Sequence, residues 1–487
     1  MNRGRPWLLA ALGATACLVP IWACRYLPTV DLPQHAAQIA LWVHRDDPTY
    51  FPAGMYRFNW FTPYLGAYLL TRAFAALFSV SAAVKMTVTV AAVLVPVATY
   101  ALLRVTKGDA GWALAAVPLA FGVAFYSGFL NFLLAIPVAV LLIAAAVRYA
   151  GSPSVRAGVL LGSASFALAL CHALAFGVGA IVASAALWGA TSARAIRVRG
   201  TSVVLAPLPL VALWAVSLWL REEHVRTAMH WSGWASRPFR LPAMLLGSPR
   251  AALGWTALLV LVALLGGFGV RTRMHRGVLW ALIAAAAFFL LAPDAAFRTV
   301  ALPERFPALI AILVLPLLRM PESPRRRLAV VALLAALACS WSAYLTVRFR
   351  AFDGEMAGFD ELLARTEPGR VMRMIAIDSY SDAVPGYPLY WNTGALYQVL
   401  KGGHVAFSFS QTFAVLVQFR ETPPWAERVG AKRDALNWSD ADRYVDYFVF
   451  RSASADPQAS FPQGPERPRL VARSGAWWLY ENGGRRP

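Results

Sequence analysis

The stretch FLNFLLAIPVAVLLIAAAV, residues 129–147, carries no charged side chain and one polar amide, that of Asn131. About 20 apolar residues are enough for a helix to cross the hydrocarbon core of a bilayer. Similar runs recur along the chain, in which 59% of the 487 residues are hydrophobic and 14% are charged. A soluble protein of this size carries roughly a quarter charged residues. The sequence therefore predicts a polytopic α-helical membrane protein.

Apolar runs of this kind predict about eleven transmembrane helices. They are 7–24, 84–103, 111–126, 129–147, 157–175, 177–192, 201–219, 252–270, 278–292, 306–319 and 328–347. The first run follows MNRGR and has no clean small-x-small cleavage site after it. We interpret it as an uncleaved helix with its N-terminus in the cytoplasm. An odd number of spans then puts the C-terminus outside.

The net charge of +20 lies mostly in short loops between the apolar runs, such as RAIRVRG (194–200) and RTRMHRG (271–277). Every loop that this topology assigns to the cytoplasm is basic, as the positive-inside rule requires. The charge therefore indicates membrane orientation, and we expect no nucleic-acid partner. The arginine- and alanine-rich composition favours a bacterial protein of the inner (plasma) membrane.

One further apolar segment, 62–80, raises the possibility of a twelfth span. Counting it as a span would turn the basic loops at Arg104 and Arg148 to the outside. We therefore interpret it as a helix at the outer membrane face. The count of eleven or twelve stays open at this point.

Three regions are expected outside the membrane: 25–83, 220–250 and the chain after about 348. The sequence predicts a transmembrane domain over 1–347 and a small α+β extracytoplasmic domain over 348–487. In the latter, RVMRMIAIDSY (370–380), RYVDYFVFR (443–451) and RLVARSGAWWLYEN (469–482) are typical of strands. NTGALYQVLKGG (392–403) predicts a short helix that ends at glycine. All four cysteines lie in apolar segments, so no disulfide framework is expected.

The stretch DLPQH, residues 31–35, has two compatible interpretations. In the structural one, Asp31 and Gln34 form a capping box at the start of an amphipathic surface helix. His35, Gln38 and Trp42 then lie on its solvated face. In the functional one, the Asp31 carboxylate takes a proton from a hydroxyl or binds a divalent cation. The His35 imidazole then bonds a substrate or a phosphate, and Gln34 is a candidate substrate ligand.

The order of these features resembles the GT-C superfamily of membrane glycosyltransferases, which includes protein O-mannosyltransferases, oligosaccharyltransferases and aminoarabinose transferases. The motifs that carry the resemblance are short, and they are DLPQH, YSGFLNFLLAIP (126–137), LCHALAF (170–176) and ALPERFPAL (301–309). The resemblance covers most of the membrane part and points to an uncharacterised bacterial branch. It implies a GT-C-like fold and transfer of a sugar from a polyprenyl-phosphate donor to a lipid, glycan or protein acceptor outside. Such enzymes use an acidic residue of the first outer loop, a position that Asp31 matches.

A donor phosphate needs a cation at the lipid boundary, and arginine can bind it bidentately. Arg305 in PERF, beside Glu304, is the candidate clamp. The alternatives are an arginine that snorkels from a helix end or one that pairs with Glu304.

The sequence departs from the family at its second outer loop, FYSGFLNF (125–132). Many GT-C enzymes carry a second acidic motif there, whereas this loop has no carboxylate. Tyr126 and Asn131 are candidate sugar ligands, but they are not bases or strong metal ligands. Whether the chain is active, and whether it uses Mg²⁺ or Mn²⁺, therefore stays open.

Other polar residues give weaker signals. His172, near the predicted outer end of span 157–175, is either a substrate ligand or a neutral histidine bonded to a backbone carbonyl. The loop REEHVRTAMHWSGW (221–234) contains Glu222, Glu223, His224 and His230, for which a solvated loop is favoured over a metal site. Two other functions remain open: a lipid or glycolipid transporter or flippase, and an inactive GT-C-like assembly subunit.

Overall fold

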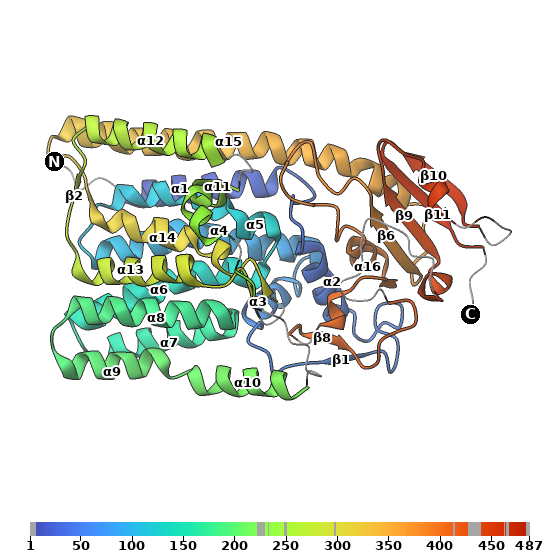
Figure 1. Ribbon diagram of the computed structural model, residues 1–487, viewed down its shortest axis with the longest axis horizontal. Coiled ribbons are helices and arrows are strands. Elements are labelled where there is room, and N and C mark those ends of the chain that lie inside the picture. Colours follow the sequence, from blue (N-terminus) through green and yellow to red (C-terminus); the bar gives the residue numbers. More distant parts are fainter. Residues whose placement is uncertain are drawn as a thin grey trace.

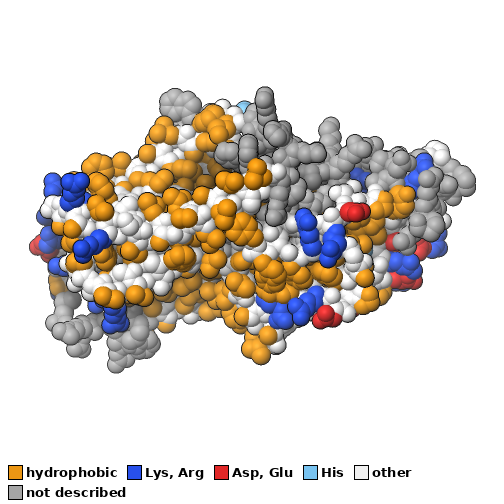
Figure 2. All heavy atoms as spheres, turned by 90° about the horizontal axis from the view of Figure 1, so that it is seen from below, with side chains coloured by type: hydrophobic (Ala, Val, Ile, Leu, Met, Phe, Trp, Pro, Cys, Tyr) orange, Lys and Arg blue, Asp and Glu red, His pale blue; other side chains and the backbone are white. Residues whose placement is uncertain are grey.

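A computed structural model describes residues 6–221, 229–231, 233–247, 251–296, 299–412, 414–426, 440–461, 463 and 467–483. Its helices lie along the long axis of the molecule, with the N-terminus at one end and a small sheet at the other (Figure 1). On the face seen in Figure 2, apolar side chains cover most of the half nearer the N-terminal end, and few charges appear among them. This distribution is that of a helical bundle surrounded by lipid.

The membrane part consists of helices joined by short turns. Their bounds are α1 Pro6–Trp22, α4 Val80–Val105, α5 Val123–Ser127, α6 Leu130–Gly151, α7 Val155–Cys171, α8 Ala173–Ala190, α9 Arg194–Leu205, α10 Leu208–Arg221, α11 Arg237–Leu246, α12 Ala251–Gly267, α13 Arg276–Leu291, α14 Pro307–Val314 and α15 Pro324–Leu363. Short 3-10 helices η1 (Ala110–Ala116) and η2 (Pro118–Phe121) precede α5, and η4 (Pro303–Arg305) precedes α14. The predicted span 111–126 is thus a series of short helical turns.

Among the described residues, six helical stretches are long and apolar enough to cross a membrane, or seven if the bent pair α11 and α12 counts as one span. Four shorter apolar helices lie at Leu8–Trp22, Val155–Cys171, Arg276–Leu291 and Pro307–Leu317. Each predicted span overlaps one of these stretches. The protein is a multi-pass membrane protein, and the number of eleven stays a prediction.

The loops predicted to be cytoplasmic lie at the N-terminal end of the bundle (Figure 1). Two of them join through β2 (Arg271–Thr272), which pairs with β5 (Leu318–Arg319). The side chain of Arg273 donates to the backbone oxygens of Lys107 and Pro316. Lys and Arg lie at this end of the molecule and again beyond the apolar area, toward the sheet at the opposite end (Figure 2).

The segment predicted to lie at the outer membrane face contains α3 (Gly66–Phe74), which has nine residues. At 1.5 Å per residue it is about 14 Å long, too short to cross a bilayer. It packs beside α2 (Leu32–Val43), between the bundle and the C-terminal part.

The C-terminal part is an α+β unit that α15 enters without a break. This helix has forty residues, about twice what a membrane needs. The predicted boundary at 347/348 falls inside it. The sheet has the order β10-β11-β9-β6-β7. Its strands are β6 Val371–Ala376, β7 His404–Val405, β9 Tyr447–Arg451, β10 Arg469–Ser474 and β11 Trp477–Glu481.

The predicted strands and helix of this part are present. In the sheet β6 runs parallel to both β7 and β9, whereas β11 is antiparallel to β9 and β10. The predicted helix is α16 (Ala395–Lys401), and it ends at Gly402, whose φ is 71°. The chain leaves the helix through a glycine with positive φ, a backbone conformation that residues with a side chain rarely adopt.

The first outer loop and the C-terminal part form one layer. β1 (Tyr56–Phe58) pairs antiparallel with β8 (Val417–Phe419), and α16 packs against α2. The expectation of an amphipathic helix on the membrane surface is therefore wrong for α2. Both of its faces are buried, because the C-terminal part covers the polar one. This layer brings residues of the two regions together above the bundle.

Candidate functional site

The Asp31 segment is fixed by backbone hydrogen bonds to the second outer loop. Val30 N donates to Tyr126 O at 2.8 Å, and Asp31 N donates to Ser127 O at 3.0 Å. Gly128 makes this close approach possible, since its φ is +74° and a Cβ there would lie 2.7 Å from Asp31 N. The loop YSGFLNF thus acts through its backbone to hold Asp31.

Asp31 is the N-cap residue of α2, but its side chain does not cap the helix. The carboxylate instead accepts a hydrogen bond of 2.8 Å from Asn392 Nδ2. Gln34 does not close a capping box either, because its amide bonds Phe407 O and Phe409 N in the C-terminal part. The capping-box interpretation is therefore wrong, because contacts distant in sequence satisfy both side chains.

His35 is half-buried between α3 and the C-terminal part. Its Nδ1 lies 2.8 Å from the Tyr68 hydroxyl, and its ring meets Phe409 edge-on at a centroid distance of 5.4 Å. Burial lowers the pKa of His35 to about 4, so the imidazole is neutral at pH 7. The alternative of a solvated interfacial histidine is wrong. A neutral ring here can orient the Tyr68 hydroxyl or accept a hydrogen bond.

Arg305 is buried at the start of α14, with 8% of its surface exposed. Its Nε and Nη2 donate to the backbone oxygens of Ala301 and Val300, at 3.1 and 2.9 Å. Ala301 has a φ of 54°, a strained value for a residue with a side chain. The guanidinium lies over Phe129, with its carbon 3.9 Å from the ring centre. Two hydrogen bonds to backbone oxygens and a cation–π contact thus hold this side chain in place.

No carboxylate of the described residues lies within ion-pair distance of Arg305. Glu304 turns away from it, toward Arg240 at 3.9 Å. Both alternatives for Arg305, snorkelling and pairing with Glu304, are therefore wrong. Burial lowers its pKa to about 10, while the charges of Tyr64 and Asp31 act in the opposite direction. Arg305 remains a cation at pH 7, and Asp31 is close enough to act on it electrostatically.

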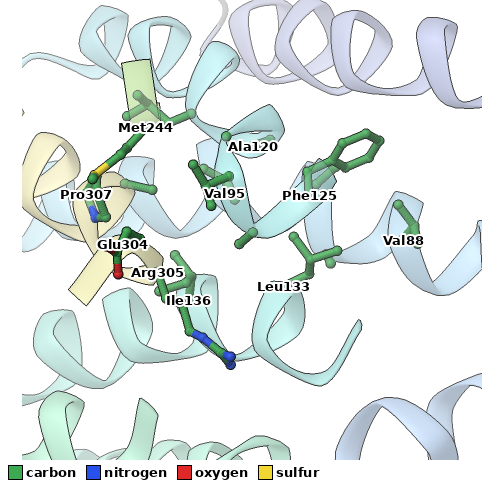
Figure 3. A pocket seen from close by; sticks show the side chains of 17 residues that line it. Val88, Val95, Ala120, Phe125, Leu133, Ile136, Met244, Glu304, Arg305 and Pro307 are labelled. Atoms are coloured by element: carbon green, nitrogen blue, oxygen red, sulfur yellow. The ribbon is translucent and has the colours of Figure 1, made fainter. Parts of the chain in front are cut away.

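An apolar pocket lies beside Arg305. It is lined by residues of α4, η2, α5, α6, α11, η4 and α14, most of them small or aliphatic. Val95, Leu133, Ile136 and Met244 lie around it in Figure 3, where Glu304 and Arg305 are its charged members. Burial raises the pKa of Glu304, and its buried Oε2 has no hydrogen-bond partner among the described residues. The pocket offers an apolar wall with a cation beside it.

Two predicted sugar ligands have structural contacts. Asn131 Oδ1 accepts a hydrogen bond of 3.2 Å from Ala67 N at the start of α3. The Tyr126 ring stacks on Tyr387, with centroids 5.0 Å apart. Both side chains are buried. Both side chains thus contact other residues of the protein. Their role as sugar ligands stays a prediction.

His172 separates α7 from α8, which the sequence divided at residue 176. Its Nδ1 accepts from Ala175 N at 3.5 Å and caps α8, so the expected bond to a backbone carbonyl is not the one formed. Its ring lies edge-on to Tyr64 and Phe132, at centroid distances of 4.7 and 5.2 Å. His172 therefore belongs to the aromatic surroundings of Arg305.

Of the other polar residues considered, Glu222, Glu223 and His224 lie outside the described residues. The backbone of His230 bridges to Ala295. Within the described part of the chain, no group of three or more His, Cys, Asp or Glu side chains could hold a metal ion.

The sequence did not identify Asn392, Tyr68 or Phe129 as site residues. Tyr68 carries a polar tip in a short apolar helix, which is a signal that could have been used. Asn392 gives no local signal, because it lies 361 positions from Asp31.

No known family model matches the sequence, and no curated protein matches it in sequence. Two solved structures are similar to it in fold. The arabinofuranosyltransferase AftD from Mycobacteria is 15% identical with a TM-score of 0.53, over 99% of this chain and 40% of AftD. ArnT from Cupriavidus metallidurans, solved bound to undecaprenyl phosphate, is 14% identical with a TM-score of 0.50, over the whole of both chains. The chain spans less than half of AftD.

These similarities concern the fold. This chain shares the overall fold of AftD and of ArnT. The resemblance carried by the short sequence motifs is confirmed at this level.

Proposed function

We propose that this chain is a bacterial inner-membrane glycosyltransferase that moves a sugar from a polyprenyl-phosphate donor to an acceptor on the outer face. The observation that carries the proposal is Arg305: a buried cation without a carboxylate partner among the described residues, at an apolar pocket. A buried charge is costly unless an anion pairs with it. A lipid phosphate supplies both the anion and the apolar chain that this arrangement accommodates.

The donor would bind with its isoprenoid chain along the apolar pocket and its phosphate at Arg305. ArnT, which shares the fold, was solved with undecaprenyl phosphate, a ligand of this class. Arg305 is held by two backbone oxygens and Phe129, so it needs little reorganisation to bind an oxyanion. The Arg305 charge also stabilises the polyprenyl phosphate that leaves when the sugar is transferred.

In the transfer step, an acceptor hydroxyl attacks the anomeric carbon of the donor sugar. A new carbon–oxygen bond forms as the bond to the phosphate oxygen breaks, usually with inversion in this fold. Asp31 takes the hydroxyl proton as general base. Asp31 and Arg305 interact electrostatically. This supports a single site in which Asp31 is the base and Arg305 binds the phosphate.

Mg²⁺ and Mn²⁺ prefer several oxygen ligands, and at Asp31 the Asn392 amide N–H already approaches Oδ1. The described residues around Asp31 do not supply the oxygen ligands of a protein-built metal site.

A second candidate function is an inactive subunit that binds the lipid donor without turning it over. It is favoured by the second outer loop, which has no carboxylate and whose Asn131 amide oxygen is committed to Ala67 N. Both candidates require donor binding, and they differ in whether the bound donor loses its sugar. A transporter or flippase is less well supported, because the charged groups of the site gather at one end of the bundle.

Donor binding is tested by native mass spectrometry after incubation with undecaprenyl phosphate. We expect wild type and Glu304→Gln to retain the lipid, and Arg305→Met, which keeps the side-chain length but removes the charge, to lose it. Equal retention by Arg305→Met and wild type would remove the basis of the proposal. A circular dichroism melt of each variant separates loss of binding from loss of folding.

A further inference from the structure

The C-terminal part reaches the Asp31 carboxylate through one buried side chain. Asn392, 2% exposed, donates from Nδ2 to Asp31 Oδ1 at 2.8 Å. An ionised carboxylate only accepts hydrogen bonds, so the amide must turn its N–H₂ group toward it. Asn392 O accepts from Ala395 N at 3.0 Å as the chain enters α16, which fixes the backbone that carries the amide.

Other contacts between α2 and the C-terminal part fix the position of Asn392 relative to Asp31. On α2, Gln34 bonds Phe407 O and Phe409 N, and Gln38 bonds Ser410 Oγ and both backbone groups of Val417. α16, which follows Asn392, packs on the same helix. These buried amide contacts place the C-terminal part on α2 in a single arrangement. The distance between Asn392 and Asp31 is therefore set by the whole interface.

Among the described residues, two titratable groups from other elements interact electrostatically with Asp31. Arg305 of η4 attracts the ionised form, and Tyr68 of α3 has its pKa raised by burial and then by the Asp31 charge. His35 of α2 is neutral and bonds Tyr68. A hydrogen bond donated to a carboxylate favours its ionised form and fixes the direction of its oxygens. Asn392 is the described C-terminal side chain with a hydrogen bond to this carboxylate.

We propose that Asn392 is a positioning residue of the transfer reaction, through which the C-terminal part holds Asp31 ionised and oriented for proton abstraction. This inference rests on the proposed function. Without the C-terminal part in place, the membrane part would bind donor but would have a poorly oriented base. The C-terminal part is then a component of the active site as well as a covering layer.

The test compares Asn392→Asp and Asn392→Ala with wild type. Asn392→Asp has the same shape but puts a second carboxylate beside Asp31, so one of the two binds a proton at higher pH. Gln458→Glu in η8 (Pro457–Ser460) is the matched control, since it adds the same charge elsewhere in the C-terminal part. Rates are measured as polyprenyl-phosphate release from synthetic polyprenyl-phosphate pentoses and hexoses, with bacterial membrane extract as acceptor source.

We expect the acidic limb of the pH–rate profile to move up by about one pH unit or more in Asn392→Asp. The plateau should fall about 10- to 100-fold in Asn392→Ala, the range for a lost hydrogen bond to a charged group. Retention of undecaprenyl phosphate should be unchanged in both. Wild-type profiles in both variants would overturn the inference.

An infrared titration makes the test independent of turnover. The carboxyl band that Asp31→Asn removes is followed with pH in wild type and in Asn392→Asp. A protonation midpoint that moves upward in Asn392→Asp, and not in Gln458→Glu, supports the inference even if no donor is turned over. An unmoved midpoint overturns it, whereas absence of transfer by wild type with every donor counts against the proposed function alone.

Discussion

The guanidinium carbon of Arg305 lies 3.9 Å from the centre of the Phe129 ring, and the same side chain donates to two backbone oxygens. The side chain is thus held before any ligand binds. Lysine at this position could not keep both backbone bonds and also bind a phosphate bidentately. We expect Arg305→Lys to weaken undecaprenyl-phosphate binding by about 10- to 100-fold, as a titration by native mass spectrometry would measure. Unchanged affinity would mean that charge alone, without the forked geometry, holds the ligand.

Gly128 tests whether the backbone of the second outer loop positions Asp31. An alanine there would adopt a φ of +74° and put its Cβ 2.6 Å from Leu32 N and 2.7 Å from Asp31 N. Because the backbone must shift, we expect Gly128→Ala to lower transfer by about tenfold or more. Gly177→Ala is the control, since a Cβ there meets nothing within 4 Å. Equal transfer rates in the two variants would show that this loop does not set the position of Asp31.

Gln38 tests the attachment of the C-terminal part to α2. Its amide bonds Ser410 Oγ, Val417 N and Val417 O, and the side chain is 1% exposed. Gln38→Ala would leave buried backbone groups without partners, at a cost of about 2–4 kcal/mol in the free energy of unfolding. We expect a lower melting temperature and faster proteolysis after α15. The control Gln411→Ala removes one bond, to Ala406 O, and should have the smaller effect on both.

Two histidines with lowered pKa values, His35 and His404, make the fold sensitive to acid. Burial lowers the pKa of His35 and of His404 to about 4, from an unfolded value near 6.5. The unfolded chain therefore binds more protons, and stability falls as the pH drops from about 6.5 toward 4. We expect the melting temperature to decrease over this window, and the decrease to be smaller in His35→Asn and in His404→Asn, each compared with its own value at pH 7. A melting temperature that does not change between pH 7 and pH 4.5 would contradict this.

Local patterns predicted the apolar helices and the strands of the C-terminal part. Long apolar runs and alternating strands are properties of neighbouring residues, so RVMRMIAIDSY and RYVDYFVFR were sufficient to locate β6 and β9. The position of α16 followed from the glycines after it. The boundary between α7 and α8 was harder to predict. His172 is both the C-cap of α7 and the N-cap of α8, and its side chain accepts a hydrogen bond from the first turn of α8.

The site could be predicted only in part. DLPQH and PERF pointed to Asp31 and Arg305, and the structure puts them close enough to interact electrostatically. The polar face of α2 was interpreted as solvated because its cover lies more than 300 positions away in the sequence. Gln34, Gln38 and Asn392 make contacts across 373, 379 and 361 positions, which no periodicity can indicate.

The central claim is that Asp31 is the base that allows transfer from a bound donor. It is tested most directly by the mass of the lipid that the protein retains after incubation with a polyprenyl-phosphate sugar and bacterial membrane extract. We predict that wild type retains polyprenyl phosphate without the sugar, and that Asp31→Asn retains the intact donor. If Asp31→Asn removes the sugar as fast as wild type, Asp31 is not the base. If wild type keeps the intact donor with every sugar and extract tried, the chain is a donor-binding subunit and not a transferase.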